Sequence, residues 1–374
     1  MAPSIGRPGA RFALSVCCLL AVAAFFSVAA RFAFSATGRD RDLVERERYG
    51  VEMLHPLTTL LSQLVSAQSA AVRGEQVDAA GVRQAVSAVA QEDTRYGTVL
   101  GTHQRLSDLT ARIESTLAAA PAGRRAYQDF GELVDLTVDL IHRVGDTAAL
   151  VHDPDLDAYY LMDAAITRLP DVMVYAGRTA DLVALVGGED LAGEDAVQVA
   201  VARFGVSSDA ERVSTGLATS VDNTARAQLG TNIAQALDSF LGAVDAFAPP
   251  TMLQELANTV DASVVADRAE RVFDTATSLT HLLLRELQAL LDARAGSLSQ
   301  RNQILVIACV AAGLFGIALA FLVLVKGSNR PSPDADGSAT RVGVGSLPRP
   351  ERDQERIPAR HGVDSAATRA RDAR

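Results

Sequence analysis

The chain is poor in several residue types on which common functions depend. None of its 374 residues is tryptophan, only 5% are aromatic, and Lys326 is the only lysine. Because no G-x-x-x-x-G-K-[ST] pattern surrounds that lysine, the sequence excludes a nucleotide-hydrolysing P-loop. A composition dominated by Ala, Leu, Val and Arg favours helices packed by small aliphatic side chains over β-sheets. We therefore expect an all-α fold.

Cysteine is also scarce, and all three copies lie inside two long apolar runs. Cys17 and Cys18 fall in the first run and Cys309 in the second. The region between the runs contains no cysteine, so no disulfide can stabilise it. Its stability must come from packing alone.

The first apolar run covers residues 12–30, which include no charged side chain. About 20 apolar residues match the hydrocarbon thickness of a bilayer, so we interpret this run as a transmembrane helix. A cleaved signal peptide is the alternative, because Arg7 and Arg11 precede the run and Val28-Ala29-Ala30 fits a small-residue cleavage site.

The second apolar run covers residues 304–325 and is closed by Lys326. It is long enough to span a bilayer with some tilt. Small residues recur on it at every fourth position, namely Ala308, Ala312, Gly316 and Ala320. A stripe of small residues lets two helices approach closely, so it predicts pairing with the first span or with a second copy of the chain.

These runs divide the chain into five regions. We expect a cytoplasmic tail (1–11), a span (12–30), an extracytoplasmic domain (31–303), a second span (304–325) and a disordered cytoplasmic tail (326–374) rich in Pro, Gly, Ser and Arg. Both tails carry net positive charge, whereas residues between them are strongly acidic. An acidic domain argues against a nucleic-acid partner, which needs basic patches.

Apolar residues between the spans recur at intervals of three and four, as on the buried faces of helices. The clearest rows are Leu54, Leu57, Leu61, Leu64; Leu133, Leu136, Leu140, Val144; Val213, Leu217, Val221; and Leu279, Leu283, Leu287, Leu290. Helix-breaking residues separate the rows at Gly74, Pro121, Pro154, Gly187-Gly188 and Pro249-Pro250. The pattern predicts an elongated antiparallel bundle of about six long helices.

Two further features concern helix continuity. From Asp261 to the second span only Gly296 interrupts the helical pattern, so we expect one helix to run from the bundle into the membrane. Pro56 and Pro170 lie inside helical patterns and predict a kink, or a helix boundary at the preceding residue.

One block of sequence resembles a known class of sensor. Residues 152–163 are H-D-P-D-L-D-A-Y-Y-L-M-D, and Arg168-Leu169-Pro170 follows. Together with Arg48–Val51 and Leu290–Arg294, this block resembles the extracytoplasmic sensor regions of bacterial chemoreceptors (methyl-accepting chemotaxis protein-like) and membrane-bound diguanylate cyclases. The order of span, helical region and span is similar to the helical bimodular sensor type. In such receptors a HAMP linker and an output domain follow the second span, whereas here only the expected disordered tail does.

Within the block, Asp153, Asp155 and Asp157 alternate as in a calcium-binding loop. However, Ala158 and Ala164 stand where such a loop needs glycine and glutamate. We therefore favour helix capping by Asp153 or Asp155 over calcium binding. Tyr159 and Tyr160 are expected to pack in the bundle, and a ligand contact by Asp157 or by one of these tyrosines is the alternative.

The sequence offers little catalytic chemistry. Glu52-x-x-His55 and Asp139-x-x-His142 have the spacing of di-iron bundles, but the two further glutamates of such a site are not evident. Neither H-E-x-x-H nor G-x-S-x-G occurs. We expect no metal, no cofactor and no enzymatic activity.

Two functions fit these observations. The first is a membrane-anchored sensor-like homodimer whose helical bundle binds a small ligand or partner, with a separate signalling protein supplying the output. The second is a structural or assembly protein that uses the bundle to oligomerise at the membrane.

Overall fold

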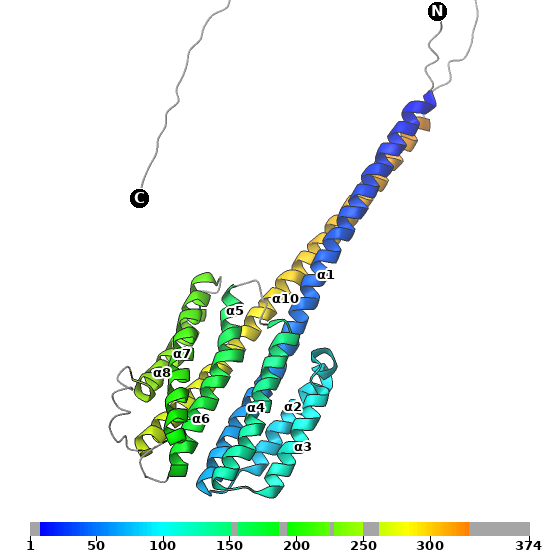
Figure 1. The fold of residues 1–374 in the computed structure, drawn as a ribbon. Helices are drawn as coiled ribbons and strands as arrows, with labels where there is room; N and C mark the ends of the chain where they lie inside the picture. The colour runs from blue at the N-terminus through cyan, green and yellow to red at the C-terminus, as the bar shows by residue number, and fades with distance from the viewer. Residues whose placement is uncertain (1–7, 151–155, 187–192, 225–227, 250–261, 329–374) are drawn as a thin grey trace, which may run out of the picture. The chain divides into compact units, whose positions relative to one another are not determined.

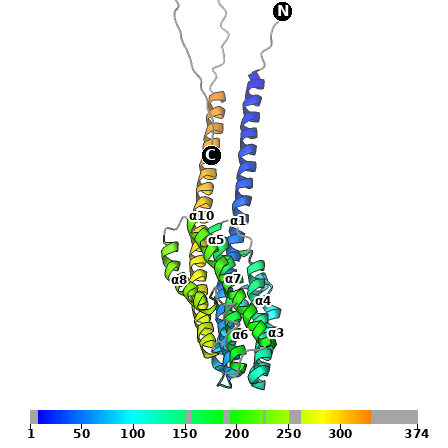
Figure 2. The ribbon, with the colours of Figure 1, turned by 60° about the vertical axis from the view of Figure 1, so that its left-hand side comes forward.

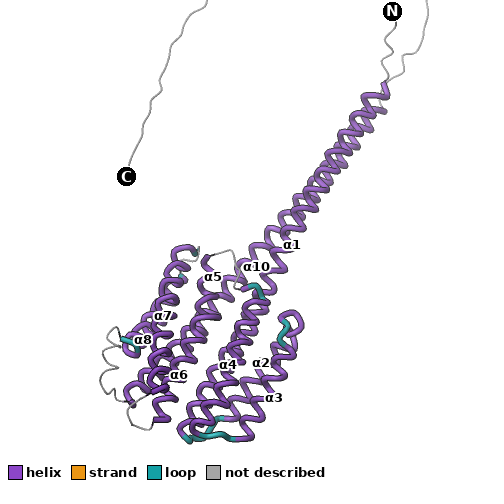
Figure 3. The backbone as a smooth tube through the Cα atoms, viewed as in Figure 1, coloured by secondary structure: helices purple, strands orange, loops and turns teal. Residues whose placement is uncertain are grey.

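The computed structural model describes residues 8–150, 156–186, 193–224, 228–249 and 262–328, with only some of the side chains before residue 38 and after residue 319. Within these ranges 94% of the residues are helical and none forms a strand, which confirms the all-α expectation (Figure 3). The chain divides into two compact units, Met1–Phe321 and Leu322–Arg374. The described helices lie in the first unit, apart from residues 322–328.

The helices are labelled in Figure 1. In chain order they are α1 (Pro8–Arg73), α2 (Ala79–Leu100), α3 (His103–Ala119), α4 (Gly123–Thr147), α5 (Leu156–Met162), a π-helical turn (Asp163–Arg168), α6 (Leu169–Val186), α7 (Gly193–Asn223), α8 (Leu229–Phe247) and α10 (Ala262–Ser328).

Local capping explains where the first helices end and begin. Gly74 adopts a left-handed φ of +71°, and Glu75 N donates to Ala70 O, which closes the C-terminus of α1. Asp78 then caps α2, because its carboxylate accepts a hydrogen bond from Gly81 N at 2.9 Å. The chain therefore reverses direction within a few residues, and α2 lies antiparallel to α1.

The helices share one core. Helix α1 packs against α2, α4 and α6, while α7 packs against α5, α6 and α8. Buried apolar side chains from all of these helices and from α10 form a single cluster. Both α1 and α10 project from the same end of the bundle, as the views in Figures 1 and 2 show.

The predicted apolar rows form this core. Every residue of the four rows is buried except Leu136 and Val221, which are half-buried and pack against the cluster. The helical periodicity in the sequence therefore identified the inward face correctly in α1, α4, α7 and α10.

The sequence pattern predicts too few helices, because two of the expected helices are each divided in the structure. Gly101, with a φ of +64°, ends α2 and separates it from α3, where the sequence pattern predicts one helix. Thr102 Oγ1 donates to the buried Asp93, and His103 Nδ1 lies 2.6 Å from the same carboxylate, so this turn is held by side chains. A second unforeseen interruption separates α7 from α8.

The two prolines behave differently. Helix α1 continues through Pro56 without a boundary. At Pro170 the predicted boundary is present, because α6 begins at Leu169, directly after the π-helical turn. In an α-helix the ring of Pro170 would meet the carbonyl of Ile166, four residues earlier, and the wider turn relieves this conflict.

Helix α10 is uninterrupted from Ala262 to Ser328 and passes through Gly296 without a break, as expected. By length and composition it is the one helix, among the residues searched, that could cross a membrane. Its large apolar side chains beyond Gln303 are exposed: Ile304, Val306, Ile307, Val310, Leu314, Phe315, Ile317, Leu319, Phe321 and Leu322.

Other parts of the expected topology lie outside the described residues. For residues 12–30 the structure gives a helical backbone within α1 but only Ala24 and Ser27 as described side chains. Residues 329–374, most of the expected tail, lie outside the described ranges. The two-span arrangement therefore stays a proposal.

Candidate functional site

Two ion pairs attach α10 to the rest of the bundle close to the apolar end of that helix. Arg294 Nη2 lies 3.2 Å from Asp157 Oδ1 of α5, and Arg48 Nε of α1 lies 2.9 Å from Asp292 Oδ1. Asp292 and Arg294 precede Ile304 by about 15–18 Å along the helix axis. We call Arg48, Asp157, Asp292 and Arg294 the α10 junction.

Asp157 connects three helices at this junction. Its carboxylate accepts from Ala158 N at 2.8 Å at the start of α5, besides pairing with Arg294. Its carbonyl oxygen accepts from Ser220 Oγ of α7 at 2.6 Å. Because the Asp157 and Arg294 side chains are only 16% and 21% exposed, this pair is better shielded from water than the pair of Arg48 and Asp292.

Two glycines allow close helix contacts beside the junction. A Cβ atom built at Gly50 would overlap Ala148 Cβ and approach Leu150 Cδ1 to 2.8 Å. A Cβ atom built at Gly216 would lie 3.0 Å from the ring of Tyr160. At both places the backbone lies against a neighbouring side chain, so the helices around the junction have little room to shift without repacking.

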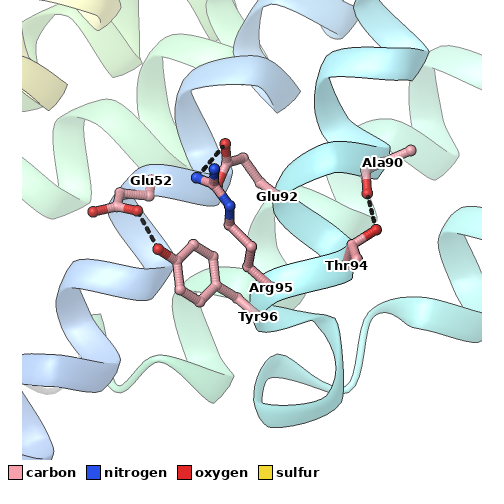
Figure 4. Close-up of polar contacts among 6 residues, drawn as sticks. All are labelled: Glu52, Ala90, Glu92, Thr94, Arg95 and Tyr96. Atoms are coloured by element: carbon pink, nitrogen blue, oxygen red, sulfur yellow. Dashed lines mark hydrogen bonds and ion pairs between the residues drawn. The ribbon is translucent and has the colours of Figure 1, made fainter.

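An aromatic contact joins α2 to the same region of α1. The Tyr96 hydroxyl of α2 donates to Glu52 of α1, as Figure 4 shows, and the Tyr96 ring stacks on Tyr49 with centroids 4.6 Å apart. The hydrogen bond to Glu52, followed by burial, raises the pKa of Tyr96 to about 12. Tyr96 therefore remains a neutral donor throughout the physiological pH range.

A groove between α8 and α10 is a second feature with binding potential. Its volume is about 400 Å³, within the range typical of small-ligand sites, and its walls are Asn232, Gln235, Ala236, Ser239, Asp274, Thr275 and Ser278. Beside it, Asn232 Nδ2 donates to Glu286 Oε1 at 2.8 Å. The lining contains amides, hydroxyls and one carboxylate but no cationic side chain, which favours a neutral polar or cationic ligand over an anion.

The histidines considered as metal ligands have other neighbours. Burial, followed by the charges of His281 and Arg285, lowers the pKa of His55, and burial also lowers that of His281. Both histidines, on α1 and α10, therefore favour the neutral form more strongly than a histidine in water does. No group of three or more potential ligands suited to a metal ion was found among the described residues.

The predicted site residues around α5 lie in different settings. Tyr159 and Tyr160 are half-buried and make an edge-to-face contact with centroids 5.1 Å apart. Asp157 lies in the first turn of α5, where its carboxylate accepts from Ala158 N, whereas Asp153 and Asp155 lie outside the described residues. A ligand contact of Asp157 or of the tyrosines stays a prediction.

The small-residue stripe also stays a prediction. Ala308, Ala312 and Gly316 are exposed, and a Cβ atom built at Gly316 would meet nothing within 4 Å. The side chain of Ala320 lies outside the described set.

The sequence pattern identifies the segments of the junction but not their contacts. Arg48–Val51, the block that contains Asp157, and Leu290–Arg294 stand out separately in the sequence, and the structure brings all three together. No sequence pattern predicts the groove, because its lining consists mostly of ordinary polar residues on the exposed sides of two helices.

Comparisons with protein-family models, curated proteins and solved structures found no match for this chain. A function for the chain has therefore to be inferred from its own residues and their contacts.

The two ion pairs of the junction should contribute unequally to stability. A double-mutant cycle with Asp157→Ala and Arg294→Ala should give a coupling free energy of about 1 kcal/mol, because both side chains are mostly shielded. The matched cycle with Arg48→Ala and Asp292→Ala should give less than about 0.5 kcal/mol, because that pair is exposed. Urea unfolding measures both, and equal values would show that burial does not distinguish the pairs.

Proposed function

We propose that the protein is a non-enzymatic, membrane-anchored sensor whose helical bundle binds a small polar ligand. The conformational change caused by binding is transmitted to the membrane through α10. In this proposal a separate protein supplies the output. The alternating carboxylate and tyrosine block, with its resemblance to bacterial sensor regions, supports the same class of function.

The continuity of α10 is the observation that carries the proposal. One helix forms a wall of the groove at Ser278, takes part in the junction at Asp292 and Arg294, and continues into the exposed apolar segment. The groove and the junction lie about 20 Å apart along this helix. A ligand that draws α8 toward α10 would therefore act directly on the helix that leaves the bundle.

The proposed topology has two spans, residues 12–30 and 304–325, with the bundle outside the cytoplasm and both termini inside. Support for the first span comes from its length and lack of charge, and from the helical backbone that continues into the bundle as α1. The short tail with Arg7 and Arg11 is similar to the basic region that precedes a first span on its cytoplasmic side, which supports the orientation. A homodimer paired through the spans fits the small-residue stripe.

Ligand binding at the groove is tested by thermal shift on the full-length protein in lipid nanodiscs, with a panel of small amines, amino acids and sugars. At least one compound is expected to raise the melting temperature. Ser278→Leu, which fills the groove, should abolish that rise, whereas Ser207→Leu at an exposed position of α7 should preserve it. Failure of the whole panel, or an unchanged rise in Ser278→Leu, would contradict the proposal.

The alternative function is membrane assembly, in which the bundle mainly oligomerises. An exposed apolar row on α7 favours it: Val197, Val201 and Phe204 are 62%, 62% and 68% exposed at helical spacing. If this row mediates assembly, Phe204→Ser should lower the oligomeric state in light scattering without affecting any ligand response. The two functions are thus separable by experiment.

A further inference from the structure

An acidic side chain is buried between α1 and α6, away from the junction and the groove. Asp181 of α6 is 1% exposed, and Gln68 of α1 is 2% exposed. Gln68 Nε2 donates to Asp181 Oδ2 at 2.6 Å. The remaining oxygens of both groups, Gln68 Oε1 and Asp181 Oδ1, are buried and have no hydrogen-bond partner.

The surrounding charges do not supply the missing donor. Arg73 of α1 is paired with Glu75 at 3.0 Å, and Arg178 of α6 is paired with Asp135. On the other helices, Tyr127 of α4 feels the charge of Asp181, and Glu270 of α10 acts on Arg73. Asp181 therefore has no ion-pair partner among the described side chains.

If Asp181 were ionised, its hydrogen bonding with Gln68 would be incomplete. Two acceptor oxygens would lie buried without a donor, which costs free energy at each atom. When a planar amide donates the N–H on the side of its own oxygen to a coplanar carboxyl, the other two oxygens approach each other. A single hydrogen on Oδ1 then satisfies both, since it donates to Gln68 Oε1 and closes a ring of two hydrogen bonds.

We propose that Asp181 and Gln68 form a proton-binding site inside the bundle, in which the neutral carboxyl of Asp181 donates to Gln68 and joins α6 to α1. The proton comes from solvent, and its binding changes the charge of the site from −1 to 0. This assignment does not depend on a ligand in the groove or on the membrane topology.

The electrostatic environment agrees with this geometry. Burial raises the pKa of Asp181 to about 6, although the nearby Ser69 hydroxyl, which makes no hydrogen bond of suitable geometry to Asp181, and the Gln68 amide favour its charged form. Because the pKa is higher in the folded state than in the unfolded chain, protonation favours folding. The stabilisation is complete below about pH 4 and is lost as the pH rises through 6. The contact between α1 and α6 should therefore be more stable at mildly acidic pH.

Asp181→Asn tests the site, because asparagine can form the same two hydrogen bonds with Gln68 but cannot ionise. The full-length variant should melt about 5 °C above the wild type at pH 7.5, and this difference should be much smaller at pH 4.5. Because both proteins contain His55 and His281, the effect of histidine titration on the melting temperature is the same in both and drops out of the difference at each pH. The exposed Asp238→Asn serves as the matched control and should show no such pH-dependent gain.

Infrared spectroscopy gives an independent readout. At pH 5 the spectrum of the wild type minus that of Asp181→Asn should contain the carbonyl stretch of a protonated carboxylic acid. A melting-temperature difference that is constant from pH 4.5 to 7.5, or an identical infrared spectrum in Asp181→Asn, would overturn the proposal.

Discussion

Leu140→Asp is expected to leave the bundle unfolded at 25 °C. Leu140 is 2% exposed and lies in the core-facing row of α4. Loss of its packing costs about 2–5 kcal/mol, and an unpaired buried carboxylate adds a desolvation penalty of several kcal/mol. Together these costs approach or exceed the total stability of about 5–15 kcal/mol that is usual for a folded protein.

Circular dichroism of the purified protein measures this effect, with Val99→Asp as the matched control. Val99 of α2 is 53% exposed, so the same type of change there should cost at most about 1 kcal/mol. A cooperative melt of Leu140→Asp at the wild-type temperature would show that this side of α4 is open to water.

Gly177→Leu is expected to lower stability by about 3 kcal/mol, because α1 and α6 touch at this glycine. Even a Cβ atom at Gly177 would overlap Cγ1 of Val65, a branched side chain that is 4% exposed. The gain in helix propensity of about 1 kcal/mol offsets only part of this overpacking.

Gly242→Leu on α8 provides the opposite case. A Cβ atom there would meet nothing within 4 Å, so only the gain in helix propensity applies, and urea unfolding should show a slight stabilisation. If Gly177→Leu were as stable as Gly242→Leu, the close contact between α1 and α6 would not exist in solution.

Periodic burial is what the sequence predicts best in this chain. Rows such as Leu54 to Leu64 repeat every three or four residues because one side of a helix faces the core, and that relation is local. The turn at Gly101 was missed, since a single glycine in a helical pattern is often tolerated.

Contacts between distant segments could not be derived in the same way. The pairing of Arg48 with Asp292 depends on how the helices pack, and many exposed charges could have served as partners. Asp181 did carry a readable signal: it comes after Val174 and Gly177 at intervals of seven and four, on the apolar side of α6. A carboxylate at such a position is unusual enough to predict a special environment.

The π-helical turn between α5 and α6 determines which neighbours this stretch of chain can reach. A turn with one additional residue rotates the rest of the helix by roughly 100° about its axis relative to an unbroken α-helix. Asp157, before the turn, can therefore face α10, while Asp181, after it, faces α1. A helical wheel that treats Leu156–Val186 as one regular α-helix would place one of these aspartates on the wrong side. The additional residue before Pro170 therefore changes the direction in which every later side chain of this stretch points.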